Sequence, residues 1–185
     1  MKNTNKINNI DQLFEETKIY AQNNDIEYII LFAKGVENVL KLNNMLKDSG
    51  IKLVVTTFPS NQVLYLENEA GDLEENYPEI LDSENISILE EKDISLVSST
   101  LPLEPIITPG TNTNPYSIIK MTLDLFGEGT SLAVQSALMP VDNGYIKPST
   151  RVLSLISGLA VDLETTNSRF LFHPDKGLKI NHVIK

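Results

Sequence analysis

The stretch Tyr28-Ile29-Ile30-Leu31-Phe32-Ala33 is the longest apolar run in the 185-residue chain. A continuous run of this length is typical of a buried parallel strand that is covered on both of its faces. The Lys34-Gly35 pair follows it and predicts a turn. Whether this strand belongs to a parallel sheet depends on which helices and strands precede and follow it.

Apolar residues at helical spacing predict one helix before this strand, over residues 11–22, and another after it, over residues 36–46. The Ser49-Gly50 pair ends the second helix, and residues 53–57 form a second apolar run of strand length. The order is thus helix, strand, helix, strand. This alternation predicts an α/β fold with a parallel sheet and right-handed crossovers.

The rest of the chain continues the alternation less regularly. The predicted further strands are residues 94–98, 152–157, 169–173 and 180–184, and the predicted further helices are residues 115–126 and 130–142. Residues 58–76 are expected to be irregular, with Pro78 opening a helix after them. No repeat, linker or low-complexity tract interrupts the pattern, so residues 1–185 are expected to form a single domain.

Composition excludes several classes of protein. There are no cysteines, which excludes disulfides, thiolate metal sites and thiol nucleophiles, and which fits a reducing compartment. The net charge of −10 argues against nucleic acid as a partner, because phosphate contacts need clustered Lys and Arg. The polar start, MKNTNKINN, is unlike a signal peptide, and no apolar run is long enough to cross a membrane. We therefore expect a cytoplasmic protein with no membrane partner.

Acidic residues gather in one part of the chain. Residues 67–93 hold eleven acidic residues and a single basic one, Lys92. Two interpretations stay open: a solvated helix face with its adjoining loop, or a docking patch for a basic partner.

One segment near the C-terminus resembles a known family. The stretch Ala137-Leu138-Met139-Pro140-Val141-Asp142-Asn143-Gly144-Tyr145-Ile146-Lys147-Pro148 resembles the "A-x-M-A-x-D-A-G-x-I-P" segment of stand-alone proteins similar to the C-terminal domain of pyruvate kinase. The run Arg151-Val152-Leu153-Ser154-Leu155-Ile156-Ser157-Gly158, the Thr165-Thr166-Asn167 turn and the closing Ile180-Asn181-His182-Val183-Ile184 strand resemble further parts of that family. The resemblance implies a three-layer α/β/α sandwich whose mostly parallel sheet has an antiparallel edge. It implies no kinase activity, because the active site of pyruvate kinase lies in its barrel domain.

The resemblance also implies a place for a ligand. In pyruvate kinase, the turn after the first strand of this domain contacts a phosphate of the allosteric effector. The turn here reads Lys34-Gly35-Val36-Glu37-Asn38, with a lysine where the family has hydroxyl side chains. A lysine and a helix N-terminus can both bind an anion. The implied ligand is a sugar phosphate or a mononucleotide such as flavin mononucleotide, and the sequence does not choose between them.

Other polar residues are expected near this turn, because open α/β sheets bind ligands beyond the carboxyl ends of their strands. Their hydroxyls suit a phosphorylated small molecule, although hydroxyls at strand ends also cap turns and helices. The candidate ligand-binding residues are Lys34, Gly35, Asn38, Thr56, Thr57, Ser99, Thr100, Thr111, Gly158, Thr165 and Thr166.

No catalytic or metal-binding constellation is present in the sequence. His173 and His182 are the only histidines, and neither has metal-ligand spacing to another ligand residue. Three functions stay open. The first is a non-catalytic domain that binds a phosphorylated small molecule. The second is an oligomeric interaction protein without a ligand site, with the apolar strand 180–184 as an edge that pairs with a second copy. The third is an enzyme that uses a bound cofactor.

Overall fold

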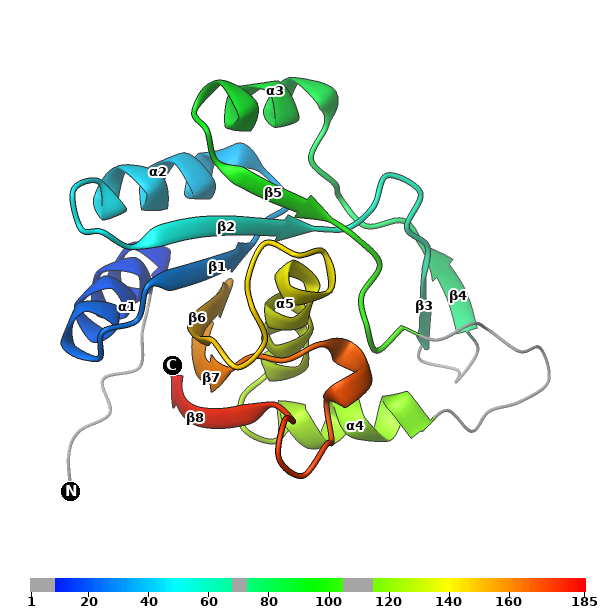
Figure 1. Cartoon of the computed structure of the whole chain (residues 1–185). Helices are drawn as coiled ribbons and strands as arrows, with labels where there is room; N and C mark the ends of the chain where they lie inside the picture. Colours follow the sequence, from blue (N-terminus) through cyan, green and yellow to red (C-terminus); the bar gives the residue numbers. More distant parts are fainter. Residues whose placement is uncertain (1–8, 68–72, 105–114) are drawn as a thin grey trace.

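The computed structural model describes residues 9–67, 73–104 and 115–185. Its helices are α1 (Ile10–Asn23), α2 (Val36–Leu46), α3 (Ser83–Glu91), α4 (Pro115–Asp124) and α5 (Thr130–Asp142), with the short 3-10 helix η1 (Ser168–Phe170). Its strands are β1 (Tyr28–Phe32), β2 (Lys52–Thr57), β3 (Leu64–Glu67), β4 (Leu73–Asn76), β5 (Ser95–Ser98), β6 (Arg151–Ile156), β7 (Leu159–Glu164) and β8 (Lys179–Ile184). Figure 1 shows their arrangement. Among the described residues, no helix is both long and apolar enough to cross a membrane.

Six strands form the central sheet, in the order β5-β2-β1-β6-β7-β8. The first four are parallel to one another, whereas β7 is antiparallel to both of its neighbours, β6 and β8. The predicted α/β class and the mostly parallel sheet are therefore confirmed.

Strand β1 explains why the apolar run decides the fold. Because successive side chains of a strand point to opposite faces, each face of the sheet receives alternate residues of the run. Ile29 and Leu31 pack with buried residues of α1, α2 and α3, whereas Ile30 and Phe32 pack with buried residues of α5. The helices thus cover both faces of the sheet (Figure 1), and the residues of β1 from Ile29 to Phe32 are buried.

Two predictions for the first half of the chain need correction. Residues 58–76 are not wholly irregular, because β3 and β4 pair as an antiparallel hairpin. Pro78 does not open a helix. Helix α3 begins at Ser83 instead, because the Asp82 carboxylate accepts a hydrogen bond from the backbone N–H of Asn85 at 2.8 Å and caps the helix.

The second half holds two further differences. The strand predicted over residues 169–173 is wrong: η1 occupies this place, and Asp142 at the end of α5 accepts hydrogen bonds from the backbone N–H of Ser168 and the side chain of Asn167. Strand β7 is not among the predicted strands, and it carries Asp162 between apolar residues. A charged residue is tolerated there because its carboxylate is fully paired.

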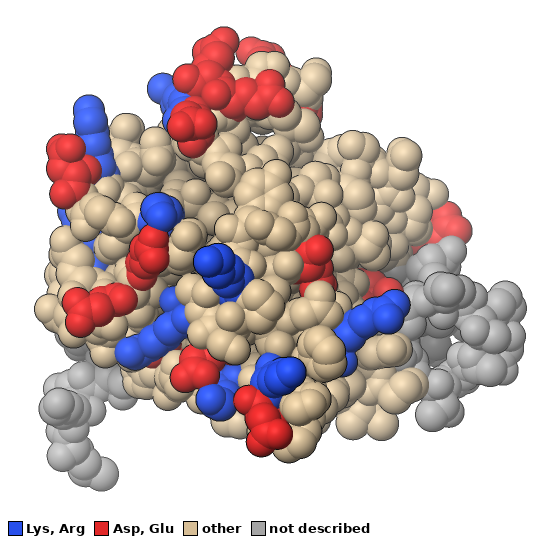
Figure 2. All heavy atoms as spheres, in the orientation of Figure 1, with Lys and Arg blue, Asp and Glu red and all other residues tan. Residues whose placement is uncertain are grey.

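The acidic tract faces solvent. All of its described acidic residues from Glu74 to Asp93 are exposed, and Figure 2 shows red atoms gathered over α3 at the top of the molecule. This exposure agrees with a solvated face, and a basic docking partner stays a prediction.

Candidate functional site

A cavity of about 670 Å³ opens at the carboxyl ends of β1 and β6. These two strands are neighbours in the sheet, but the chain leaves β1 towards β2 on one side and returns later to β6 on the other. Such a divergence of connections leaves a crevice beyond the strand ends, and ligands of open α/β sheets bind in crevices of this kind. The volume falls within the range of small-molecule sites, about 300–1,000 Å³.

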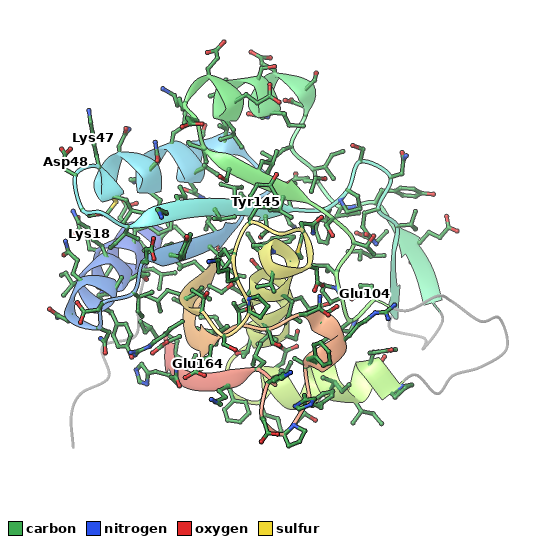
Figure 3. The ribbon with its side chains drawn as sticks, viewed as in Figure 1. Lys18, Lys47, Asp48, Glu104, Tyr145 and Glu164 are labelled. Carbon is green, nitrogen blue, oxygen red and sulfur yellow. The ribbon has the colours of Figure 1, made fainter. Side chains whose placement is uncertain are left out.

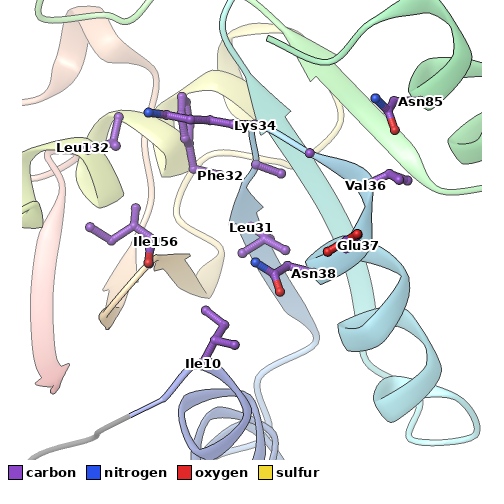
Figure 4. Close-up of a pocket in the computed structure, with 13 residues that line it drawn as sticks. Ile10, Leu31, Phe32, Lys34, Val36, Glu37, Asn38, Asn85, Leu132 and Ile156 are labelled. Carbon is purple, nitrogen blue, oxygen red and sulfur yellow. The ribbon is translucent and has the colours of Figure 1, made fainter. Parts of the chain in front are cut away.

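Most of the cavity wall is apolar. Its apolar lining residues come from three helices, two strands and the turn after β1, and they are Ile10, Leu31, Phe32, Ala33, Val36, Leu132 and Ile156. Figure 4 shows that Ile156 and Leu132 lie on one side of the cavity and the start of α2 lies on the other. A lining of this kind removes the apolar part of a ligand from water.

The start of α2 supplies the polar part of the wall. Gly35 is the N-cap residue of this helix and has no side chain to accept a hydrogen bond from the first turn. The first N–H groups of a helix have no partner within the helix, so they are available to an anion at this end. Glu37 and Asn38, in the same turn, also line the cavity.

Lys34 adds a positive charge to the cavity wall. Its side chain lines the cavity, and in Figure 4 it extends across towards Leu132, away from Glu37. Within the described parts of the chain, Lys34 forms no ion pair. The ammonium group is therefore available to a ligand.

Two further predicted residues lie beside the cavity or in its wall. Asn38 lines the wall directly, and Gly158 follows Ser157, which also lines it. Gly158 has φ +108° in the two-residue turn between β6 and β7, a conformation that favours glycine. The structure thus brings Lys34, Gly35 and Asn38 together, with Gly158 next to them in the chain.

The predicted threonines of β2 have internal partners instead. Thr56 and Thr57 are buried. The Thr56 hydroxyl lies 2.7 Å from the hydroxyl of Ser136 on α5, and the Thr57 hydroxyl donates to the backbone oxygen of Ala33 at 2.8 Å. These hydroxyls hold the carboxyl end of β2 against α5 and β1, rather than lining the cavity.

The remaining candidates lie elsewhere. Ser99 and Thr100 follow β5, and neither is among the residues that line the cavity. Thr111 lies outside the described residues. Thr165 and Thr166 lie at the other end of the strands from the cavity, because β7 runs antiparallel to β6 and ends beside the start of β6. Both are buried, and their hydroxyls donate to the backbone oxygens of Ala137 and Lys176.

A buried charge cluster lies away from the cavity. The carboxylate of Asp162 on β7 is fully buried and accepts hydrogen bonds from Arg151, Tyr20 and Asn181. Burial alone would raise the pKa of Asp162, but these hydrogen bonds outweigh it, so the pKa is lowered. Burial and the hydrogen bond to Asp162 raise the pKa of Tyr20. The cluster ties α1 to three strands and has a structural role.

The histidines also have structural contacts. His182 stacks on the ring of Tyr20, with 5.8 Å between the centroids. The Nδ1 atom of His173 accepts hydrogen bonds from the backbone N–H groups of Asp175 and Lys176. In the described ranges there is no group of three His, Asp or Glu side chains that could hold a metal ion.

Sequence reasoning missed several lining residues. Ser157 could have been found, because it follows a predicted strand at its carboxyl end, where ligands bind. Asn85 on α3 and Leu132 on α5 reach the cavity only through the packing of their helices, and no local pattern marks them.

Comparison of the sequence with protein-family models and with curated proteins found no match. The cavity and its lining residues therefore carry the functional proposal.

Proposed function

We propose that this protein is a non-catalytic small-molecule-binding domain whose ligand occupies the cavity at the carboxyl ends of β1 and β6. One observation carries the proposal: a cavity of about 670 Å³ lies where the connections of β1 and β6 diverge, with the uncapped N-terminus of α2 in its wall. In open α/β sheets this is the general place for a ligand.

The anionic end of the ligand lies at the start of α2. The free N–H groups of its first turn favour a negative group there, and the ammonium of Lys34 adds a positive charge to the same cavity. A phosphate group fits this chemistry, because it offers several acceptor oxygens to several donors at once. Glu37 stands in the same turn, and its negative charge favours a singly phosphorylated ligand over one with several phosphates.

The body of the ligand lies against the apolar wall. Phe32, Leu132 and Ile156 offer surfaces that a flat, weakly polar group can cover. The ring system of a mononucleotide, for example the flavin of flavin mononucleotide, is such a group. A sugar phosphate has a hydroxyl on nearly every carbon, and it would leave this wall poorly matched.

The proposal includes a more specific fold than the α/β class. The sheet order, with four parallel strands followed by the antiparallel strand β7 and the edge strand β8, supports a fold like that of the C-terminal domain of pyruvate kinase. In that domain, the turn after the first strand contacts an effector phosphate, and Lys34 and Gly35 occupy the corresponding turn here. The lack of cysteine supports a cytoplasmic location.

Native mass spectrometry of the freshly purified protein is the direct test. A retained mass in the range of a mononucleotide would identify the ligand. The second measurement is thermal unfolding with inorganic phosphate, flavin mononucleotide and glucose 6-phosphate added separately. A ligand at a hundred times its Kd stabilises the folded state by about 2.7 kcal/mol.

A matched pair of lysine variants locates the site. Lys34→Gln removes the charge in the cavity wall and should weaken binding about tenfold, the effect of losing one charge-assisted hydrogen bond. Lys47→Gln is the control, because Lys47 follows the other end of α2 and points away from the molecule in Figure 3. A bare protein mass together with no thermal shift from any of the three probes would overturn the proposal. An equal loss of binding in the two variants would show that the ligand does not bind beside Lys34.

A further inference from the structure

A second cavity, of about 440 Å³, lies between α4, α5 and the segment that links β7 to β8. Tyr116 lines it from α4, Leu138 from α5, Leu103 from the segment after β5, and residues 168–173 from η1 and the turn after it. Figure 1 shows the segment between β7 and β8 beside α4. This cavity shares no lining residue with the one at the carboxyl ends of β1 and β6, and its volume also suits a small molecule. We call it the η1 cavity.

Helix η1 and the turn after it explain how one short segment forms so much of the wall. Residues 168–173 all line the η1 cavity, whereas a strand would point alternate side chains to opposite faces. The backbone N–H groups of Phe170, Leu171 and His173 each donate to a backbone oxygen three residues earlier. Gly177 closes the turn, because a Cβ atom there would collide with the backbone oxygens of Leu171 and His173. The wall is therefore held in place by its own backbone, and a ligand need not order it.

Aromatic rings form the exposed part of the η1 cavity. Tyr116, Phe170 and Phe172 line it and are 40%, 47% and 73% exposed. Leu103 and Leu138 line it as well, and both are buried. Exposed rings beside a buried apolar surface can hold a flat aromatic group, which covers the rings and is itself removed from water.

Arg169 gives the η1 cavity a positive charge. Among the described residues that line the cavity there is no other Arg or Lys and no Asp or Glu, although the chain has a net charge of −10. The guanidinium of Arg169 is exposed and forms no ion pair within the described ranges. The nearby carboxylate of Asp142 accepts hydrogen bonds from Ser168 and Asn167 instead. Arg169 is therefore available to a carboxylate, to which a guanidinium can donate two parallel hydrogen bonds.

Two more hydrogen-bond donors belong to the same wall. The Nδ1 atom of His173 accepts hydrogen bonds from the backbone N–H groups of Asp175 and Lys176, at 3.1 Å and 3.2 Å, so the neutral ring carries its proton on Nε2. Ser168 adds a hydroxyl. The side chains at this wall thus offer several donors and no competing carboxylate, which suits a ligand group that only accepts hydrogen bonds.

We propose that the η1 cavity binds a small aromatic carboxylate, with its ring against Tyr116, Phe170 and Phe172 and its carboxylate on the guanidinium of Arg169. A carboxylate fits better than a phosphate monoester, because a single guanidinium balances one negative charge and not two. The inference does not rest on the function proposed for the cavity at the ends of β1 and β6, because the two cavities have no residue in common.

Saturation-transfer NMR with 2-naphthoate and its neutral amide, 2-naphthamide, tests the proposal by measuring the Kd of each. The acid should bind about tenfold more tightly than the amide, the effect of one charge-assisted hydrogen-bonded pair. Arg169→Gln should remove this difference by weakening the acid alone. Lys176→Gln is the matched control, because Lys176 is an exposed cation of the same turn that does not line the cavity. It should leave both Kd values unchanged, and circular dichroism should show both variants folded.

Two further variants test the aromatic wall and the choice of cavity. Phe172→Ala should weaken the acid and the amide equally, by about threefold or more, because both lose one aromatic contact. Lys34→Gln should weaken neither, because Lys34 lines the other cavity. No saturation transfer to either probe, equal Kd values for acid and amide, or an acid that binds Arg169→Gln as tightly as the wild type would overturn the proposal. Loss of the acid from Lys34→Gln would also overturn it, by assigning the acid to the cavity beside β1. None of these results depends on whether a mononucleotide binds there.

Discussion

Arg151 binds the carboxylate of Asp162 at two points: Nε donates to Oδ1 at 2.9 Å and Nη2 donates to Oδ2 at 2.6 Å. The residues lie on the neighbouring antiparallel strands β6 and β7, where Leu153 is the residue directly opposite Asp162. Tyr20 of α1 and Asn181 of β8 complete the partners of the carboxylate. One buried charge thus joins a helix and three strands.

Loss of Arg151 should therefore be costly. Arg151→Ala leaves the buried Asp162 carboxylate without its counter-charge, which destabilises a protein by about 3 kcal/mol at the lower end of the usual range. The lower end applies because Arg151 itself is part-exposed. Urea unfolding at neutral pH measures the change in the free energy of unfolding.

The neighbouring pair Lys179 and Glu164 is the control for this prediction. It joins β8 to β7 at 2.8 Å on the surface, and Lys179→Ala should change stability by less than about 1 kcal/mol. Similar losses from the two variants would show that burial of Asp162 does not decide the cost.

The same carboxylate should make the fold sensitive to acid. Its pKa is lowered in the folded state, so its contribution to stability is fully present above the unfolded value of about 3.9 and is lost as pH falls towards the lowered value. The free energy of unfolding should therefore decrease below about pH 4. Asp162→Asn removes the titrating group, and its stability should fall less steeply over that pH range than that of the wild type. The measurement is urea unfolding across a pH series, with Asp175→Asn at an exposed position as the control variant. Parallel curves for the wild type and Asp162→Asn would refute the assignment.

Thr17 offers a site where a substitution should stabilise the protein. The residue is completely buried on α1, and its hydroxyl has no hydrogen-bond partner in the described structure. Thr17→Val keeps the shape and removes the unsatisfied group, so it should stabilise the fold by about 1 kcal/mol. Thr57→Val is the control: its hydroxyl donates to Ala33, and its loss should destabilise by a similar amount. Thermal unfolding distinguishes the two directions, and a destabilised Thr17→Val variant would contradict the prediction.

The sequence allowed the parallel half of the fold to be predicted, because its signals are local. The continuous apolar run of β1 and the helical spacing from Val36 to Leu46 each reflect burial on known faces. The antiparallel half was harder to predict. Strand β7 carries Asp162, and a buried carboxylate is acceptable only because Arg151 lies 11 residues away in sequence and across the hairpin in space. The spacing of apolar residues in the sequence does not indicate that pairing.

Some residues of the candidate site could likewise be predicted from the sequence, and others could not. Lys34, Gly35 and Asn38 could be placed from the sequence, because the turn after the first strand of an open sheet faces the crevice. Thr165 and Thr166 could not, because the rule holds for parallel strands and β7 runs the other way. Thr56 and Thr57 are at the expected edge, but their hydroxyls bind neighbouring layers, and only the packing of α5 decides this.

The central position of β1 has a consequence for synthesis on the ribosome. It is the first of the six sheet strands to be made, yet its neighbour β6 and the covering helix α5 emerge only after α2, β2, α3, β5 and α4. Until then, the nascent chain carries an apolar strand with one open edge and one uncovered face. Pairings between segments so distant in the chain are slow to form, and exposed strand edges invite association. Chains arrested before Thr130 should therefore depend on chaperones to stay soluble, whereas chains that include all six strands should not.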